Sequence, residues 1–193
     1  MAIRTELKVV AAACVAGATA LLAAGCGGGS GSADQPQPGE RQALRAYVGR
    51  VEPLRLDVNR LLAGADPILT GYSEQRLSAA EAQRRMRRLE RRFARYAAQV
   101  AAVKPVPPTL VAAQNAYAHT YVQEDAYLRA LVSALPKRDW ASLPHTEASQ
   151  RRALVAWRAA IALEAARLDV TIPDDLAVAG RDEITPSPQG EDD

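Results

Sequence analysis

The densest charged cluster of the sequence is a run of arginines in the segment 84–95, where Glu90 is the only acid. A helix that places Met86 and Phe93 in its core keeps all of these arginines out of the apolar seam, so they coat its outer face. Such a face can bind phospholipid headgroups, an anionic polymer or an acidic protein surface. The same pattern fits a solvated face whose arginines pair with acids on neighbouring helices. The arginines are Arg84, Arg85, Arg87, Arg88, Arg91, Arg92 and Arg95.

A second group of polar residues recurs at helical spacing in the segment 108–135. The face that carries Leu110, Leu128 and Leu131 is the buried one, and Glu124 falls on it. A buried carboxylate needs a partner or takes up a proton. Arg158, or the Trp157 indole together with tyrosine hydroxyls, can provide that partner if the chain turns near residue 140. The predicted buried group is Tyr117, Tyr121, Glu124, Trp157 and Arg158.

This buried group has two interpretations. It can line a polar pocket for a small ligand between the third and fourth helices. It can also be a satisfied hydrogen-bond network that fixes the register of the helices.

Patterns typical of catalytic and metal sites are absent from the sequence. Its two histidines are His119, on the predicted solvent side of a helix, and His145, at a proline corner. No Glu-x-x-His pair, zinc-ligand cluster, P-loop or glycine-rich nucleotide loop occurs. We therefore expect a protein that is not an enzyme and uses no metal or other cofactor.

The N-terminus reads as an export signal. Arg4 and Lys8 precede an uncharged segment, 9–24, that is too short and too rich in alanine for a membrane span. The segment ends in Leu-Ala-Ala-Gly-Cys at 22–26, small residues before a thiol, and a Gly/Ser-rich run follows. This pattern resembles the lipobox of bacterial lipoproteins, although the leucine lies one place further from the cysteine than in the commonest form. An ordinary secretory signal cut near Ala24 is the alternative.

The resemblance implies that the chain is cleaved before Cys26, whose sulfur carries acyl chains such as palmitate. The mature protein is then anchored by lipid to the outer face of the cytoplasmic membrane, in the cell envelope. Two acyl chains are enough for stable anchoring. The other cysteine, Cys14, leaves with the signal, so the mature domain has no disulfide. Export also argues against a nucleic-acid partner, as does the lack of stacking aromatic residues beside the arginines.

Helical periodicity runs through the segment 40–172. Prolines and glycines divide it into helices near 40–64, 78–103, 108–135 and 145–171, and Pro53 predicts a kink in the first. Ser78 and Glu81 form a capping-box pattern that starts the second. Short connections make consecutive helices antiparallel. The predicted fold is all-α, an antiparallel up-down four-helix bundle, with a three-helix arrangement broken at Pro53 as the competing fold.

The domain organisation follows from these segments. Residues 1–25 are the signal peptide, 26–39 the lipidated cysteine and a flexible linker, 40–172 the bundle, and 173–193 a mostly disordered acidic tail. The net charge of +2 favours no particular partner. We expect an envelope lipoprotein whose bundle is a binding or scaffolding module for another envelope protein or an anionic polymer. A small-ligand binding or sensor domain that uses the polar core of the third and fourth helices is the alternative.

The lipid anchor gives the first testable prediction. Wild-type chain expressed in a bacterium should incorporate labelled fatty acid and fractionate with membranes, because the thioether at Cys26 holds it there. The Cys26→Ala variant should incorporate no label and be released or remain unprocessed. Label on the variant, or an unlabelled soluble wild type, would contradict the assignment.

Overall fold

Every regular element in the described part of the chain is a helix, which confirms the all-α class. The computed structural model describes residues 37–177, 183–185 and 187–188, so the predicted signal, Cys26 and most of the linker lie outside the described residues. The longer helices are α1 (Pro38–Leu62), α2 (Asp66–Ser73), α3 (Ala79–Ala101), α4 (Val111–Ala134) and α5 (Glu147–Leu168). A short α6 (Asp174–Ala177) and 3-10 turns at Pro108–Leu110, Leu135–Lys137 and Trp140–Ser142 complete the fold.

Local sequence signals set several helix ends. The Ser78 hydroxyl accepts the N–H of Glu81 at 3.2 Å and caps α3, as predicted. Proline-rich residues 105–108 separate α3 from α4. α1 passes through Pro53 as one continuous helix. Proline removes the bond to the carbonyl four residues earlier, and that residue, Gly49, is exposed, so its carbonyl can bond to water instead.

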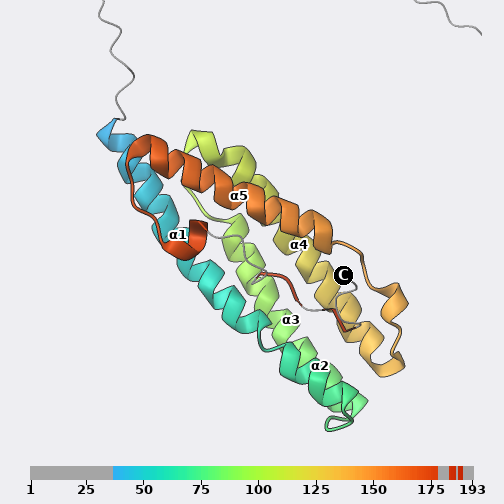
Figure 1. The fold of residues 1–193 in the computed structure, drawn as a ribbon. Helices are drawn as coiled ribbons and strands as arrows, with labels where there is room; N and C mark the ends of the chain where they lie inside the picture. Colours follow the sequence, from blue (N-terminus) through green and yellow to red (C-terminus); the bar gives the residue numbers. More distant parts are fainter. Residues whose placement is uncertain (1–36, 178–182, 186, 189–193) are drawn as a thin grey trace, which may run out of the picture. The chain divides into compact units, whose positions relative to one another are not determined.

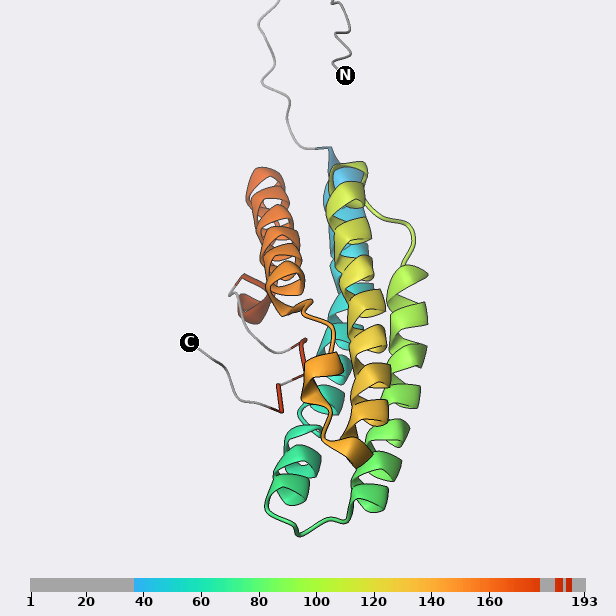
Figure 2. The same ribbon diagram turned by 90° about the vertical axis from the view of Figure 1, so that its right-hand side faces the viewer.

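The four long helices α1, α3, α4 and α5 run up and down beside one another (Figures 1 and 2). α3 packs against α1 and α4, and α5 packs against α4 and α1, which closes the bundle. α2 follows α1 and packs against α3. The antiparallel up-down four-helix bundle predicted from the sequence is therefore confirmed.

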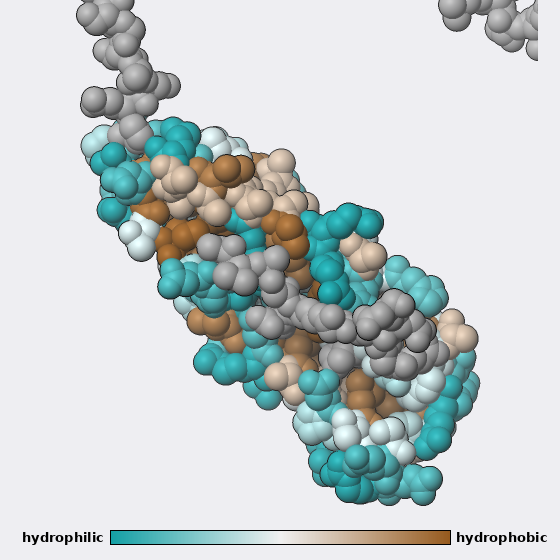
Figure 3. All heavy atoms as spheres, in the orientation of Figure 1, coloured by the Kyte–Doolittle hydropathy of each residue, from teal (hydrophilic) through white to brown (hydrophobic). Residues whose placement is uncertain are grey.

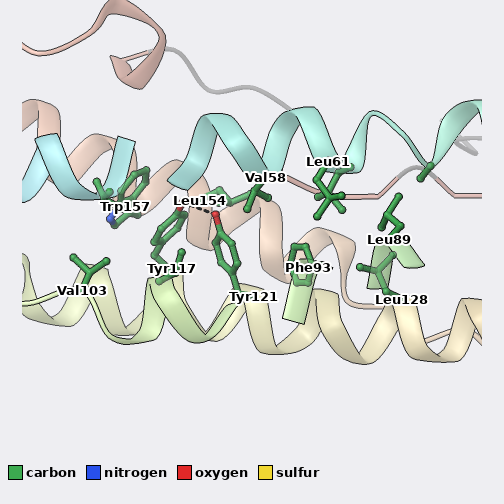
Figure 4. Packing of buried hydrophobic residues seen from close by; sticks show 14 of the residues in the cluster. Val58, Leu61, Leu89, Phe93, Val103, Tyr117, Tyr121, Leu128, Leu154 and Trp157 are labelled. Carbon is green, nitrogen blue, oxygen red and sulfur yellow. Dashed lines mark hydrogen bonds between the residues drawn. The ribbon is translucent and has the colours of Figure 1, made fainter. Parts of the chain in front are cut away.

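Aromatic rings form the centre of the core (Figure 4). The Trp157 ring of α5 stacks on Tyr117 of α4 at 3.9 Å between centroids, and Tyr117 meets Tyr121 edge to face at 5.1 Å. Tyr121 stacks in turn on Phe93 of α3 at 5.6 Å. Beyond Phe93 the core continues with leucines, among them Leu128. Stacked aromatic pairs add about 0.5–1.5 kcal/mol each beyond the area they bury.

The chain reverses after α5 and returns along the bundle. Asp169 adopts a left-handed conformation, with φ of 53°, and the Val170 N–H bonds to the Ala165 carbonyl at 2.9 Å, a common helix ending. α6 then packs against α5, with Leu176 fully buried. Glu183 and Thr185 are each only 4% exposed.

Part of the segment 173–193, predicted to be a mostly disordered acidic tail, packs on the bundle. The structure describes residues 173–177, 183–185 and 187–188 of it, and Leu176, Glu183 and Thr185 are buried, whereas the rest of the segment lies outside the described residues. Polar composition predicts disorder because such residues bury little apolar surface. Here the bundle core supplies charged and hydroxyl groups that pair with the tail, in addition to the apolar burial of Leu176.

Hydrophilic and hydrophobic residues are unevenly distributed over the face of the molecule in Figure 3. In the view of Figure 3 the end of the molecule that carries α2 is mostly hydrophilic, whereas hydrophobic residues gather nearer to α5. Of the helices in the described residues, none is long and apolar enough to cross a membrane.

Candidate functional site

Two buried charges meet where α4, α5 and the tail come together. The Arg158 guanidinium on α5 lies 3.1 Å from the Glu183 carboxylate, and both side chains are at most 3% exposed. The Tyr121 hydroxyl on α4 donates to the same carboxylate at 3.2 Å, and the Tyr117 and Tyr121 hydroxyls are hydrogen-bonded at 2.8 Å. Arg158 is therefore buried as predicted, but its acid comes from the tail.

Glu124 lies nearby and has different partners. Its carboxylate accepts from the Gln150 amide at 3.0 Å, from the Thr185 backbone N–H at 3.0 Å and from the Thr185 hydroxyl. The residue is 1% exposed, so its predicted burial is confirmed. The predicted pairing with Arg158 or Trp157 is wrong, because the residue of α5 that bonds to Glu124 is Gln150, eight positions earlier in the chain.

The connection between α4 and α5 explains this shift in register. We assumed a tight turn near residue 140. Instead, the short helix Trp140–Ser142 packs against α4. The chain therefore runs back along α4 before α5 begins at Glu147, which brings the first turn of α5 level with Glu124.

The Trp157 indole joins a separate polar chain. Its N–H donates to the Tyr47 hydroxyl at 2.9 Å, and Tyr47 donates to the Gln114 side-chain oxygen at 2.6 Å. The Gln114 amide then donates to the Val100 carbonyl at 3.0 Å. These bonds link α5, α1, α4 and α3, so they satisfy buried polar groups and set the relative positions of all four helices.

A third polar cluster joins α1 to the tail. Arg55, 1% exposed, donates to both oxygens of Glu52 at 2.8 and 2.7 Å and also pairs with Asp175. Sequence reasoning missed Arg55, which is buried whereas its neighbour Leu54 is only half-buried. The available signal was the spacing of Arg55 from Val51 and Val58, which puts it on the same helix face.

Burial dominates the electrostatics of this region. It raises the pKa of Glu124 and that of Glu183 above the ordinary glutamate value, against the opposing effect of their hydrogen bonds. Burial also raises the pKa of the Tyr117 and Tyr121 hydroxyls, and that of Tyr47 to about 12. The tyrosines are therefore neutral hydrogen-bond donors at physiological pH.

The arginines of α3, unlike these buried groups, lie on the protein surface. All seven are exposed, as predicted. Arg84 and Arg85 pair with Glu81 on their own helix, and Glu90 lies 3.5 Å from Arg129. Within residues 37–177, 183–185 and 187–188 no acid forms an ion pair with the remaining five: Arg87, Arg88, Arg91, Arg92 and Arg95. We call the seven residues the arginine surface.

An open groove of about 400 Å³ borders this surface between α1 and α3. Arg85, Arg88 and Arg92 line one side of it. Arg60 and Asp57, which pair with each other, come from α1, and the apolar side chains of Leu61 and Leu89 contribute as well. An anionic group in this groove would be near several guanidinium groups at once.

No group of three or more His, Cys, Asp or Glu side chains among the described residues is arranged to hold a metal ion. Comparisons of the chain with protein-family models, with curated proteins and with solved structures found no match. The candidate sites are therefore the buried polar groups at α4, α5 and the tail, and the arginine surface of α3.

The buried pair on α5 gives a prediction for stability. Arg158→Met and Glu183→Gln should each lower the free energy of unfolding by about 3 kcal/mol, the lower end of the cost of breaking a buried ion pair. The double variant should lose clearly less unfolding free energy than the two single variants added together, because changing both residues leaves neither of them as an unpaired charge. Urea unfolding measures all three values.

Arg151, also on α5, is the matched control. It pairs with Glu147 in a partly exposed i,i+4 position, so Arg151→Met should change the stability by less than about 1 kcal/mol. Additive losses at Arg158 and Glu183 would contradict the pairing.

The raised pKa of Glu124 gives a prediction for pH. A carboxyl whose pKa is higher in the folded state binds its proton more tightly there, so it favours folding fully below the ordinary glutamate pKa. That contribution is lost as the pH rises through the raised pKa. Since Glu124→Gln does not titrate, the stability of wild type minus that of the variant should fall from about pH 4 to pH 8. A constant or growing difference in urea unfolding would contradict this.

Proposed function

We propose that this protein is a membrane-anchored envelope lipoprotein whose helical bundle binds an anionic partner, an envelope polymer or the acidic surface of another envelope protein. The proposal rests on the arginine surface of α3. Its single strongest support is that five exposed arginines on one helix have no acidic partner within the described residues.

Repulsion between these arginines gives a physical reason to expect a partner. Like charges four residues apart on a helix destabilise it by about 0.2–0.5 kcal/mol per pair. Arg88 lies four residues from both Arg84 and Arg92, and Arg91 lies four residues from both Arg87 and Arg95. The acids of α3 are Glu81, which pairs with Arg84 and Arg85, and Glu90, which is directed to Arg129. An anion that binds across the surface would relieve this repulsion.

The shape of the surface supports contact rather than solvation alone. The groove of about 400 Å³ lets an anionic group approach Arg85, Arg88 and Arg92 from one side while Leu61 and Leu89 offer apolar contact. Guanidinium groups form bidentate bonds with carboxylates and phosphates, so both acidic peptides and phosphate-bearing polymers fit this chemistry.

Binding of polyanions tests the proposal. Residues 27–193, made without lipid, should bind polyglutamate and vesicles that contain phosphatidylglycerol at low salt. The affinity should fall steeply near physiological ionic strength, where the screening length is about 8 Å. Reversal of charge at Arg87, Arg88, Arg91 and Arg95 to glutamate should abolish binding, measured by co-sedimentation or fluorescence anisotropy.

A control variant separates this surface from net charge. Arg45, Lys104, Lys137 and Arg152 are exposed and lie outside the arginine surface, and their reversal to glutamate changes the net charge equally. That variant should retain most of the binding. Equal losses in the two variants, or no binding by the wild type at low salt, would refute the role of the arginine surface.

A further inference from the structure

The docked tail shows what the core of α4 and α5 can recognise. The Glu183 carboxylate receives the Arg158 guanidinium at 3.1 Å and the Tyr121 hydroxyl at 3.2 Å. Two residues later, Thr185 donates its backbone N–H and its hydroxyl to Glu124. The bundle therefore offers donors for a carboxylate and, beside them, an acceptor for an N–H and a hydroxyl.

Other bundle residues hold these recognition groups in place. The Tyr121 ring stacks on Phe93, and its hydroxyl bonds to Tyr117. The second oxygen of Glu124 is held by Gln150 at 3.0 Å. None of these supporting contacts involves the tail, so the receiving side of the site belongs to the bundle alone and is pre-organised for its ligand.

The contacts made by the tail are of a kind that another chain can replace. Glu183 and Thr185 attach through polar groups, and Ile184 between them is only half-buried against the core. When the tail leaves, Arg158 and Glu124 lose these partners, so the tail gives way only to a segment that supplies the same groups. Burial also raises the pKa of Glu183, which means that the ionised carboxylate is held against a desolvation penalty.

We propose that Arg158, Tyr121 and Glu124 form a binding site for an acidic peptide segment, in which a glutamate is followed two residues later by a threonine or serine. Residues 183–185 are its resident ligand in the same chain. A segment of this type from another protein binds when the tail is displaced. The site lies on α4 and α5, so it is independent of the arginine surface on α3.

The test uses a peptide as the probe and a chain whose own tail cannot bind. The probe is acetyl-Glu-Ile-Thr-Pro-amide, which copies residues 183–186 and carries the glutamate carboxylate as its only charge. The protein is residues 27–193 with Glu183→Ala and Thr185→Ala. This opened variant should bind the peptide in isothermal titration calorimetry. Wild-type protein should bind about tenfold more weakly or worse, because the resident segment keeps most of the sites occupied.

Two controls isolate the proposed contacts. The same peptide with glutamine in place of glutamate should lose most of its affinity for the opened variant, since the donors of Arg158 and Tyr121 then face a neutral amide. Adding Arg158→Met to the opened variant should have a similar effect. Adding Arg151→Met, on the partly exposed side of α5, should leave peptide binding unchanged.

Several outcomes would overturn the proposal. Equal binding of the peptide by wild type and opened variant would do so, as would the absence of binding by an opened variant that retains the helical circular dichroism of the wild type. Equal binding of the glutamine peptide would also refute the site. If the opened variant loses its helical signal, Glu183→Gln in the wild-type chain, which keeps the size of the side chain, provides the same comparison with the same readings.

Discussion

The structure depends on the pairing of charges inside the α4/α5 side of the bundle. Arg158, Glu124 and Glu183 are all at least nine-tenths buried, and an unpaired charge in such a place costs several kcal/mol. Each of them is paired or hydrogen-bonded, but two of the partners, Glu183 and Thr185, come from beyond the last long helix. The four helices therefore do not satisfy their own core, and the returning tail is part of the fold rather than an appendage.

The same constraint organises the rest of the core. The aromatic stack of Trp157, Tyr117, Tyr121 and Phe93 places two hydroxyls and an indole N–H in the interior, where each needs an acceptor. Tyr47 and Gln114 satisfy the indole through one hydrogen-bonded chain, and the tail carboxylate accepts from Tyr121. Leucine packing alone tolerates sliding between helices, whereas these directional bonds allow one register.

Arginine has two separate roles in this molecule. Arg55 and Arg158 are buried and bound to carboxylates of the chain itself, so another anion can reach Arg158 only if it replaces Glu183. The arginines of α3 point outward, and most have no acid beside them in the described residues. Only the latter group is in a position to attract an anionic partner over distances comparable to the screening length. The exposed arginines of α3 can therefore attract an anion from a distance, whereas Arg158 can bind one only in direct contact.

The sequence by itself determined the four long helices, their antiparallel order and most of their buried faces, although it did not reveal the burial of Arg55 on α1. Periodicity, proline positions and the Ser78 cap are local properties, so they predicted α3 and the exposure of Arg84 to Arg95, as well as the burial of Glu124. Only the tertiary structure decided which groups pair with the buried polar side chains. Gln150 faces Glu124 because the connection after α4 runs back along that helix, a path that periodicity does not encode. Glu183 and Thr185 lie in a segment without periodicity, and their burial follows from groups that the folded bundle presents to them.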